Sequence, residues 1–184
     1  MRDIKVASRY AKSLLGIAVD NKCLEAVYQD MTMINKVCNE NHELVLVLKN
    51  PIVKGDKKLA ILNEIFKSIN NVSASFVKII VAKQREALLV DIANAFIEAY
   101  KEHHNIKTAY VTSAVALSAE QKENIKKLIN KTYNSTIELV EKVDGEIIGG
   151  IILRVEDKQV DESIKRKLQN LVMEFNENPY VKAI

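Results

Sequence analysis

The residues that could catalyse a reaction or bind a metal are few in this chain and lie far apart. Its three histidines are His42, His103 and His104. Adjacent residues on a helix point about 100° apart, so His103 and His104 cannot both bind one metal ion from one helix face. Their position predicts a solvated helix end, where the helix dipole favours a histidine. His42 has no evident Cys, Asp or Ser partner, so the histidines predict no metal site.

The two cysteines are not arranged for chemistry either. Cys23 and Cys38 lie fifteen positions apart, with no Cys-x-x-Cys pair and no histidine at a zinc-like spacing. Structural zinc sites and redox pairs depend on such spacings. The sequence therefore predicts two free, buried thiols in a reducing cytosol.

A glycine pair and two aspartates are the remaining candidates for a site. Gly149-Gly150 is not a phosphate loop, because it has neither GxGxxG spacing nor a following Lys-Ser/Thr. Within an apolar strand, such a pair is typical of a bulge or of a place where another backbone comes close. Asp161 suits a helix cap, and a small α/β enzyme using Asp157 or Asp161 would lack a nucleophile and a cofactor loop. The sequence predicts no catalytic residue, no cofactor and no metal.

Charge is mildly positive, with 27 Lys and Arg against 24 Asp and Glu. The excess lies in residues 1–100, where Lys5, Arg9 and Lys12 share one helix face. Such a stripe is most often a solvated face. The alternative function is a cytosolic helical adaptor that binds nucleic acid or another acidic partner through this basic face. Nucleic-acid binding would call for interleaved aromatic residues, and the 6 Tyr and 4 Phe are scattered.

The elements that must carry these residues are mainly helical. Of 184 residues, 48% are hydrophobic and only 5 are Gly and 2 are Pro, too few for the turns of a many-stranded β fold. Apolar residues at three- and four-residue spacing predict a six-helix bundle over residues 1–105. Residues 43–48 suit a strand or a helix equally, and Pro51 ends that segment. We expect Asp56 and Ser73 to cap the fourth and fifth helices.

From residue 106 the pattern becomes that of a small α/β domain, residues 106–184. Alternation predicts strands at 108–117, 136–143 and 147–155. Ser118 and Gln121 form a capping box before one helix, and Asp161-Glu162-Ser163 begins another. The expected order is strand-helix-strand-strand-helix. No signal peptide and no apolar run of about 20 residues is evident, so we expect any membrane role to be exercised from outside the bilayer.

The segment from Val143 to Leu168 resembles the C-terminal signature of the δ subunit of bacterial F-type ATP synthases, which is equivalent to the mitochondrial oligomycin-sensitivity-conferring protein. The first helix (Val6–Lys12), Asn50-Pro51 and the strand 111–118 also look like this family. The residues that match its signature are Gly149, Gly150, Arg154, Asp157, Asp161, Ser163 and Leu168. Glu156 and Glu162 stand where the family commonly has Gly, and we expect both to disfavour positive φ there.

The resemblance implies a non-catalytic stator component in the peripheral stalk of the ATP synthase. The N-terminal bundle would bind the N-terminal helix of an α subunit, and the C-terminal domain would bind the b subunits. The subunit would resist rotor torque, so that proton translocation is coupled to ATP synthesis. It would lie at the cytoplasmic face of the cell membrane, peripheral to it through the complex, and would bind no nucleic acid.

Two predicted helices have a wider apolar surface than packing against a single neighbouring helix would bury. The first helix has a wide apolar sector, and residues 76–82 are apolar almost all round. An amphipathic partner helix needs such a groove. The family's groove lies between its first and fifth helices, which correspond to these segments. We expect it to be lined by Tyr10, Ala11, Leu14, Phe76, Ile79, Ile80 and Lys83.

Overall fold

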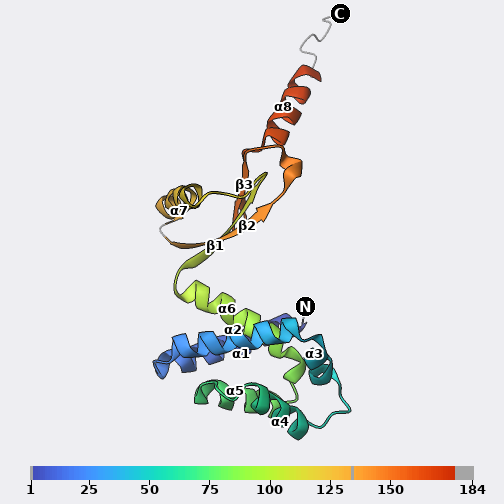
Figure 1. Ribbon diagram of the computed structural model, residues 1–184. Coiled ribbons are helices and arrows are strands. Elements are labelled where there is room, and N and C mark those ends of the chain that lie inside the picture. Colours follow the sequence, from blue (N-terminus) through green and yellow to red (C-terminus); the bar gives the residue numbers. More distant parts are fainter. Residues whose placement is uncertain (1, 134, 177–184) are drawn as a thin grey trace, which may run out of the picture. The chain divides into compact units, whose positions relative to one another are not determined.

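The computed structural model describes residues 2–133 and 135–176. The chain divides into two compact units, and the boundary along the sequence falls between His104 and Asn105 (Figure 1). The described part of the first unit contains six α-helices and a 3-10 turn, η1 (Glu86–Leu88). The helices are α1 (Arg2–Asp20), α2 (Leu24–Glu40), α3 (His42–Lys49), α4 (Gly55–Ile65), α5 (Asn71–Ala82) and α6 (Leu89–His103). The mainly α class, with a helical bundle before a small α/β part, is confirmed.

The first unit is built around α6, which packs against both α1 and α2. Each of these helices buries one stripe at three- and four-residue spacing, as an amphipathic helix requires. The stripe of α1 is mostly alanine, and small residues let a neighbouring helix approach closely. The buried residues of α1, α2 and α6 include Ala7, Ala11, Leu14, Ala18, Val27, Met31, Ile34, Cys38, Ile92, Ala93 and Phe96.

The ambiguous segment 43–48 is helical, as α3. Its end follows the expected rule, because Asn50 before Pro51 has extended backbone angles (φ −73°, ψ 118°). The predicted cap of α4 is wrong by two residues. The helix begins at Gly55, and Lys54 is its N-cap residue. Asp56 lies in the first turn, where the helix dipole stabilises a negatively charged carboxylate.

The predicted cap of α5 is also wrong, since Asn70 takes that role. The Asn70 side chain accepts a hydrogen bond from the Val72 amide at 2.9 Å, and α5 begins at Asn71. Ser73 is instead buried, and its hydroxyl donates to Asp30 Oδ2 of α2 at 2.5 Å. The same Asp30 oxygen accepts from the Asn70 amide at 2.9 Å, so one carboxylate fixes the start of α5 against α2.

The last turn of α6 is held to the start of α2 by aromatic and polar contacts. The rings of Tyr28 and Tyr100 stack with centroids 3.9 Å apart. The Tyr100 hydroxyl donates to Glu25 Oε1 at 2.7 Å, and this bond is the main reason that the pKa of Tyr100 is raised to about 12. His104, at the C-cap of α6, has Nε2 3.8 Å from the same Glu25 oxygen.

The described part of the second unit is a four-stranded sheet with two α-helices and a 3-10 turn. Its elements are β1 (Ile106–Ser113), α7 (Ala119–Tyr133), β2 (Thr136–Val143), η2 (Gly145–Ile147), β3 (Ile151–Val155), β4 (Lys158–Asp161) and α8 (Ile164–Asn176). The strand order is β2-β1-β3-β4. Strands β1 and β2 are parallel and joined through α7, whereas β3 runs antiparallel to both β1 and β4.

Helix α7 covers one face of this sheet. Alternate residues of β1 point toward it, so Ala109 and Val111 are buried while Tyr110 between them is 53% exposed. Ala109 shares a small core with Ile129 of α7, Ile137 and Val155. The capping box that begins α7 is confirmed. Its two reciprocal bonds run from the Ser118 amide to Gln121 Oε1 (2.9 Å) and from the Gln121 amide to Ser118 Oγ (3.3 Å).

Three strand predictions need correction. The first strand ends at Ser113 rather than 117, and Val115 is 73% exposed. The strand expected at 147–155 begins only at Ile151, because residues 145–147 form η2. A further strand, β4, follows a two-residue turn at Glu156-Asp157, so the expected order has one strand too few.

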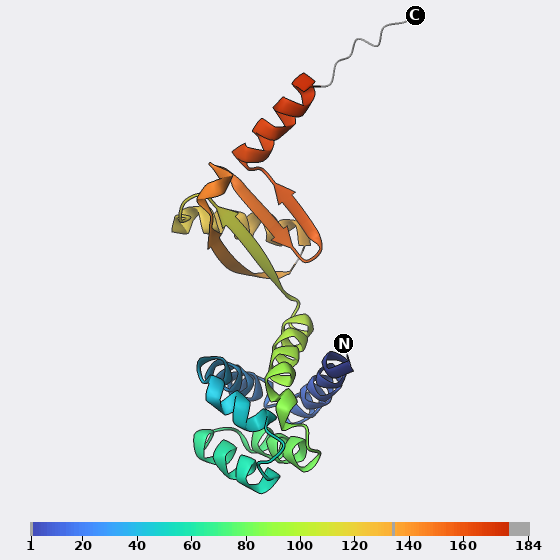
Figure 2. The ribbon, with the colours of Figure 1, turned by 90° about the vertical axis from the view of Figure 1, so that its right-hand side faces the viewer.

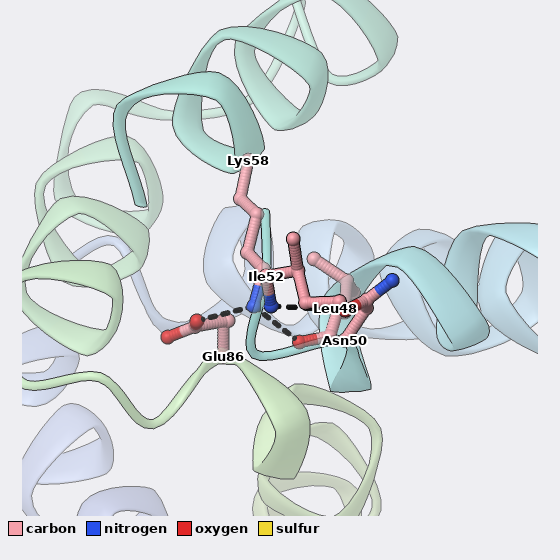
Figure 3. A network of polar contacts seen from close by, with 5 residues as sticks. All are labelled: Leu48, Asn50, Ile52, Lys58 and Glu86. Carbon is pink, nitrogen blue, oxygen red and sulfur yellow. Dashed lines mark hydrogen bonds and ion pairs between the residues drawn. The ribbon is translucent and has the colours of Figure 1, made fainter. Parts of the chain in front are cut away.

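A buried ion pair joins three segments of the first unit (Figure 3). Lys58 of α4 is only 3% exposed. Its Nζ donates to the carbonyl of Leu48 in α3 at 2.8 Å and to Glu86 Oε1 of η1 at 2.7 Å. Nearby, the Ile52 amide donates to Asn50 Oδ1 at 2.9 Å, which shapes the turn after α3. Because a buried cation requires such partners, Lys58 fixes α3, α4 and η1 together.

We expect Lys58→Met to lower the free energy of unfolding of the first unit by about 3–5 kcal/mol, since it leaves the Glu86 carboxylate buried without its cation. The double variant Lys58→Met/Glu86→Leu should recover much of that loss. Urea denaturation followed by circular dichroism measures both. Lys57→Met is the matched control, because Lys57 is the exposed neighbour. Equal effects of the substitutions at 57 and 58 would contradict the role of the ion pair.

Candidate partner-binding surfaces

Helix α8 carries an exposed apolar stripe. Ile164, Leu168, Leu171 and Phe175 are 44%, 49%, 48% and 85% exposed, and Val172 beside them is 59% exposed. The helix packs chiefly against η2 and extends away from the sheet, as Figure 2 shows. Several exposed apolar side chains on one helix face of a folded unit are typical of a surface that binds another chain.

The base of α8 is anchored by a close backbone contact at Gly150. Its φ is +79°, and a Cβ built there would collide with the carbonyl oxygen of Glu162. Only glycine meets both conditions without strain. Two hydrogen bonds close the contact: the Ile164 amide donates to the Gly149 carbonyl at 2.9 Å, and the Glu162 amide donates to the Ile151 carbonyl at 3.0 Å.

Gly149 also lies close to the start of α8. A Cβ there would lie 2.7 Å from Cδ1 of Ile164, the first residue of α8. Just before it, Ile148 has φ +68° and ψ −43°, and the Gly149 amide donates to the Ile147 carbonyl at 2.7 Å. Residues 147–149 thus form the strained type of γ-turn, which ends at the first glycine of the pair. The glycines therefore precede β3 instead of lying inside a strand, while the expected close approach of another backbone is present.

Asp161 and Ser163 form the N-terminal cap of α8. Ser163 is 2% exposed; its Oγ accepts from the Arg166 amide at 3.2 Å, and its own amide donates to Asp161 Oδ1 at 2.9 Å. Hydrogen bonds from the Ser163 hydroxyl and amide hold the pKa of Asp161 below its ordinary value. Four of the seven signature residues thus meet at the base of α8, and a fifth, Leu168, lies in its exposed stripe.

The other two signature residues lie elsewhere. Arg154 is exposed on β3, and Asp157 is exposed in the turn between β3 and β4. In that turn Glu156 has φ +52°, a position that favours glycine in a two-residue hairpin. The expectation that Glu156 would avoid positive φ is therefore wrong, and holding it there costs about 1 kcal/mol. Its carboxylate pairs with Lys107 of β1 at 3.1 Å. Glu162 has no positive φ.

The seven residues expected in a groove between α1 and α5 fall into two groups. The rings of Tyr10 and Phe76 meet edge to face, with centroids 6.4 Å apart, so the two helices do adjoin there. Ile79 is 51% exposed and Lys83 is exposed. Ala11, Leu14 and Ile80 are at most 1% exposed, however, and belong to the core of the unit. Ile17 of α1 is 43% exposed and lies seven residues after Tyr10, on the same face of the helix.

The residues considered for chemistry remain separate. His42 is exposed at the start of α3, and His103 and His104 end α6 as expected. Cys23 and Cys38 are free, but Cys23 is only half-buried, so the prediction of two buried thiols is correct for Cys38 alone. Burial raises the pKa of the Cys38 thiol. Over the described ranges 2–133 and 135–176, no three His, Cys, Asp or Glu side chains are grouped so as to hold a metal ion.

The basic stripe of α1 is solvated, since Lys5, Arg9 and Lys12 are all exposed. Of the helices in the described part of the chain, none combines the length and apolar character needed to cross a membrane.

The fold and these surfaces define a class of protein: a mainly helical protein of two units, each of which has exposed apolar side chains on a helix face. Comparison with known proteins makes this specific. The family model "ATP synthase delta (OSCP) subunit" matches residues 6–175. The chain belongs to this family, and the family named from its sequence is confirmed.

Individual relatives agree with the family match over nearly the full chain. The ATP synthase subunit delta of Cytophaga hutchinsonii is 40% identical over 178 residues, which cover 96% of this chain and 97% of the relative. That of Christiangramia forsetii is 35% identical over 184 residues, all of both chains. A chain of the Toxoplasma gondii mitochondrial ATP synthase hexamer has the same fold, with a TM-score of 0.71, 18% identity, and coverage of 94% and 98%.

We expect Gly150→Ala to destabilise the second unit by about 2–4 kcal/mol, because it adds a left-handed strain and a backbone clash. Native-state amide exchange across β3, β4 and α8 measures the loss. Gly145→Ala is the matched control, since a Cβ at Gly145 meets nothing within 4 Å. If both variants lose protection equally, the contact at Gly150 does not anchor α8.

The Asp161 cap predicts an acid-sensitive start of α8. A carboxyl group whose pKa is lowered in the folded state stabilises it above the ordinary pKa, about 3.9, and this stabilisation is lost as pH falls through the lowered value. The amides of Ser163 and Arg166 should therefore lose exchange protection below about pH 4. NMR of the wild type and Asp161→Asn measures this, and the variant should show no such step. An identical step in both would assign it to another group.

Proposed function

We propose that this chain is a stator component of an F-type ATP synthase, which connects the catalytic head to the peripheral stalk. The observation that carries the proposal is the anchored helix α8 with its exposed apolar stripe, in a chain that belongs to the delta (OSCP) family. The proposal assigns the chain no catalytic step. Its contribution is mechanical, because resisting the torque of the rotor couples proton translocation to ATP synthesis.

The first unit would bind the N-terminal helix of an α subunit at the face shared by α1 and α5. The structure restricts the residues that such a helix could touch. Ala11, Leu14 and Ile80 are already in the core, so the contact would be made by exposed or half-buried side chains. These are Tyr10, Ile17, Ile79 and Lys83, and the buried Phe76 ring packs against the Tyr10 ring. Tyr10 and Ile17 lie seven residues apart, and Ile79 and Lys83 lie four apart, so each pair lies on one helix face. An amphipathic partner helix could pack its apolar side chains between these two faces.

The second unit would bind the b subunits through α8. The glycine contact and the Ser163 cap fix the start of this helix, so the stripe from Ile164 to Phe175 is presented on a defined base. A helical stalk protein suits such a stripe, because two amphipathic helices can bury their apolar faces against each other. In this arrangement the chain would lie at the cytoplasmic face of the membrane, peripheral to it and held there through the complex.

We expect Ile79→Asp to weaken binding of a synthetic α-subunit N-terminal peptide from the same organism by tenfold or more. Burial of an Ile-sized side chain contributes roughly 1.5–3 kcal/mol, and a buried unpaired carboxylate adds a penalty. Isothermal titration calorimetry measures the affinity. Ile79 is half exposed in the free chain, so the fold should be retained.

Ile52→Asp is the matched control, because Ile52 is 87% exposed on the turn after α3, outside the proposed face. Its affinity for the peptide should equal that of the wild type. Unchanged affinity in folded Ile79→Asp would remove α5 from the proposed surface. No binding by the wild type at all would contradict the α-subunit role itself.

A further inference from the structure

The apolar stripe of α8 has the spacing of a coiled-coil seam. Ile164, Leu168, Leu171 and Phe175 follow one another at intervals of four, three and four residues. This is the d-a-d-a order of a heptad repeat over nearly two heptads. An amphipathic helix packed on its own sheet would bury this seam, but here its members are 44–85% exposed.

The residues beside the seam decide which second helix fits it. Lys165 and Val172 occupy e positions, and Lys167 and Glu174 occupy g positions. In an antiparallel pair of helices, e faces e and g faces g across the seam. The flanking charges of α8 are thus opposite in sign at its two ends, with lysine near the start and glutamate near the end.

We propose that the free chain pairs with a second copy of itself through α8, in an antiparallel arrangement. Ile164 would then pack against Phe175 of the second copy, and Leu168 against Leu171 of the second copy. The pair has a twofold axis, so each apolar layer occurs twice and the same patch serves both copies. All four seam residues of each helix are buried in this way.

The charges favour the antiparallel arrangement. It places Lys167 opposite Glu174 of the second copy twice, and Lys165 opposite Val172, where the lysine stem can cover an apolar side chain. A parallel pair would place Lys167 opposite Val172 and form no such ion pair. In the single chain Lys167 Nζ lies 3.0 Å from Glu162 Oε2, but both side chains are more than 60% exposed. An exposed pair of this kind is weak enough to exchange for another.

Self-pairing would cover the surface that the proposed function assigns to the b subunits. This consequence rests on the proposed function, whereas the pairing itself does not. If both hold, the free subunit must dissociate before it joins the stalk. The exposed stripe is then protected during the interval between synthesis and assembly.

Sedimentation equilibrium of the full chain tests the pairing. From about 10 μM to about 500 μM, the wild-type mass should rise from one chain toward two. Leu168→Glu should remain a monomer throughout. Met173→Glu is the matched control, because Met173 is 58% exposed on the opposite side of α8, and it should pair like the wild type. A monomeric wild type, or equal effects of the two substitutions, would overturn the proposal.

A charge exchange tests the orientation with substitutions at exposed positions that the fold tolerates. Lys167→Glu and Glu174→Lys should each weaken pairing about tenfold, since each replaces two attractive pairs with two repulsive ones. The double variant should restore wild-type pairing. Failure of the double variant to recover would overturn the antiparallel arrangement.

Binding of the wild type to the soluble part of a b subunit, measured separately, distinguishes the two proposals. A monomeric chain that binds it contradicts self-pairing and leaves the stator role in place. A self-pairing chain that never binds it contradicts the stator role. Where both occur, added b segment should dissociate the pair; a pair that persists beside bound b segment would contradict the shared surface.

Discussion

The second unit depends on one close contact, between the backbone at Gly150 and the carbonyl of Glu162. An amphipathic helix with an exposed apolar face gains little from its own unit, because most of its hydrophobic surface remains in water. Its direction must therefore be set at its base. The glycine pair, the Ser163 cap and two backbone hydrogen bonds provide that base within a few residues of sequence. This explains why several residues typical of the family occur together in a chain with few glycines.

The first unit consists of short helices, which must be held together by contacts between side chains because no sheet connects them within the described residues 2–104. Alanines on α1 bring it close to α6, and Asp30 fixes the start of α5 against α2. The Lys58–Glu86 ion pair then joins α4 to the end of α3 and to η1. The exposed apolar side chains of α1 and α5 can therefore be left for a partner, because the core does not need them.

Much of this organisation could be predicted from the sequence. Spacing of apolar residues identified the helices, the change of period near residue 106 identified the α/β part, and Ser118 with Gln121 identified a cap. Segments whose outcome depends on distant partners could not be predicted in this way. Ser73 looks like a cap in sequence, yet Asp30 of another helix binds its hydroxyl, while Asn70 caps the helix. Likewise β4 has little apolar pattern and forms because a turn returns the chain beside β3.

The candidate surfaces show the same division. Sequence pattern distinguished apolar helix faces from polar ones, but it could not separate the buried Leu14 and Ile80 from the exposed Ile79, because all lie in apolar sectors. The role of the glycine pair required the position of the β4–α8 connection. Ile148 carries no sequence signal of its positive φ, whereas the glycine that the family commonly has at position 156 was a signal of the positive φ of Glu156.

The stacked rings of Tyr28 and Tyr100 have a mechanical consequence. The backbone that connects the two units continues from the last turn of α6 at residues 104–105, so tension carried along this connection reaches that turn first. A lone helix end would unwind residue by residue under such a pull. Here the stack and the Tyr100–Glu25 hydrogen bond transfer tension to α2 within one turn. The load is then shared by two helices instead of being carried by the end of one.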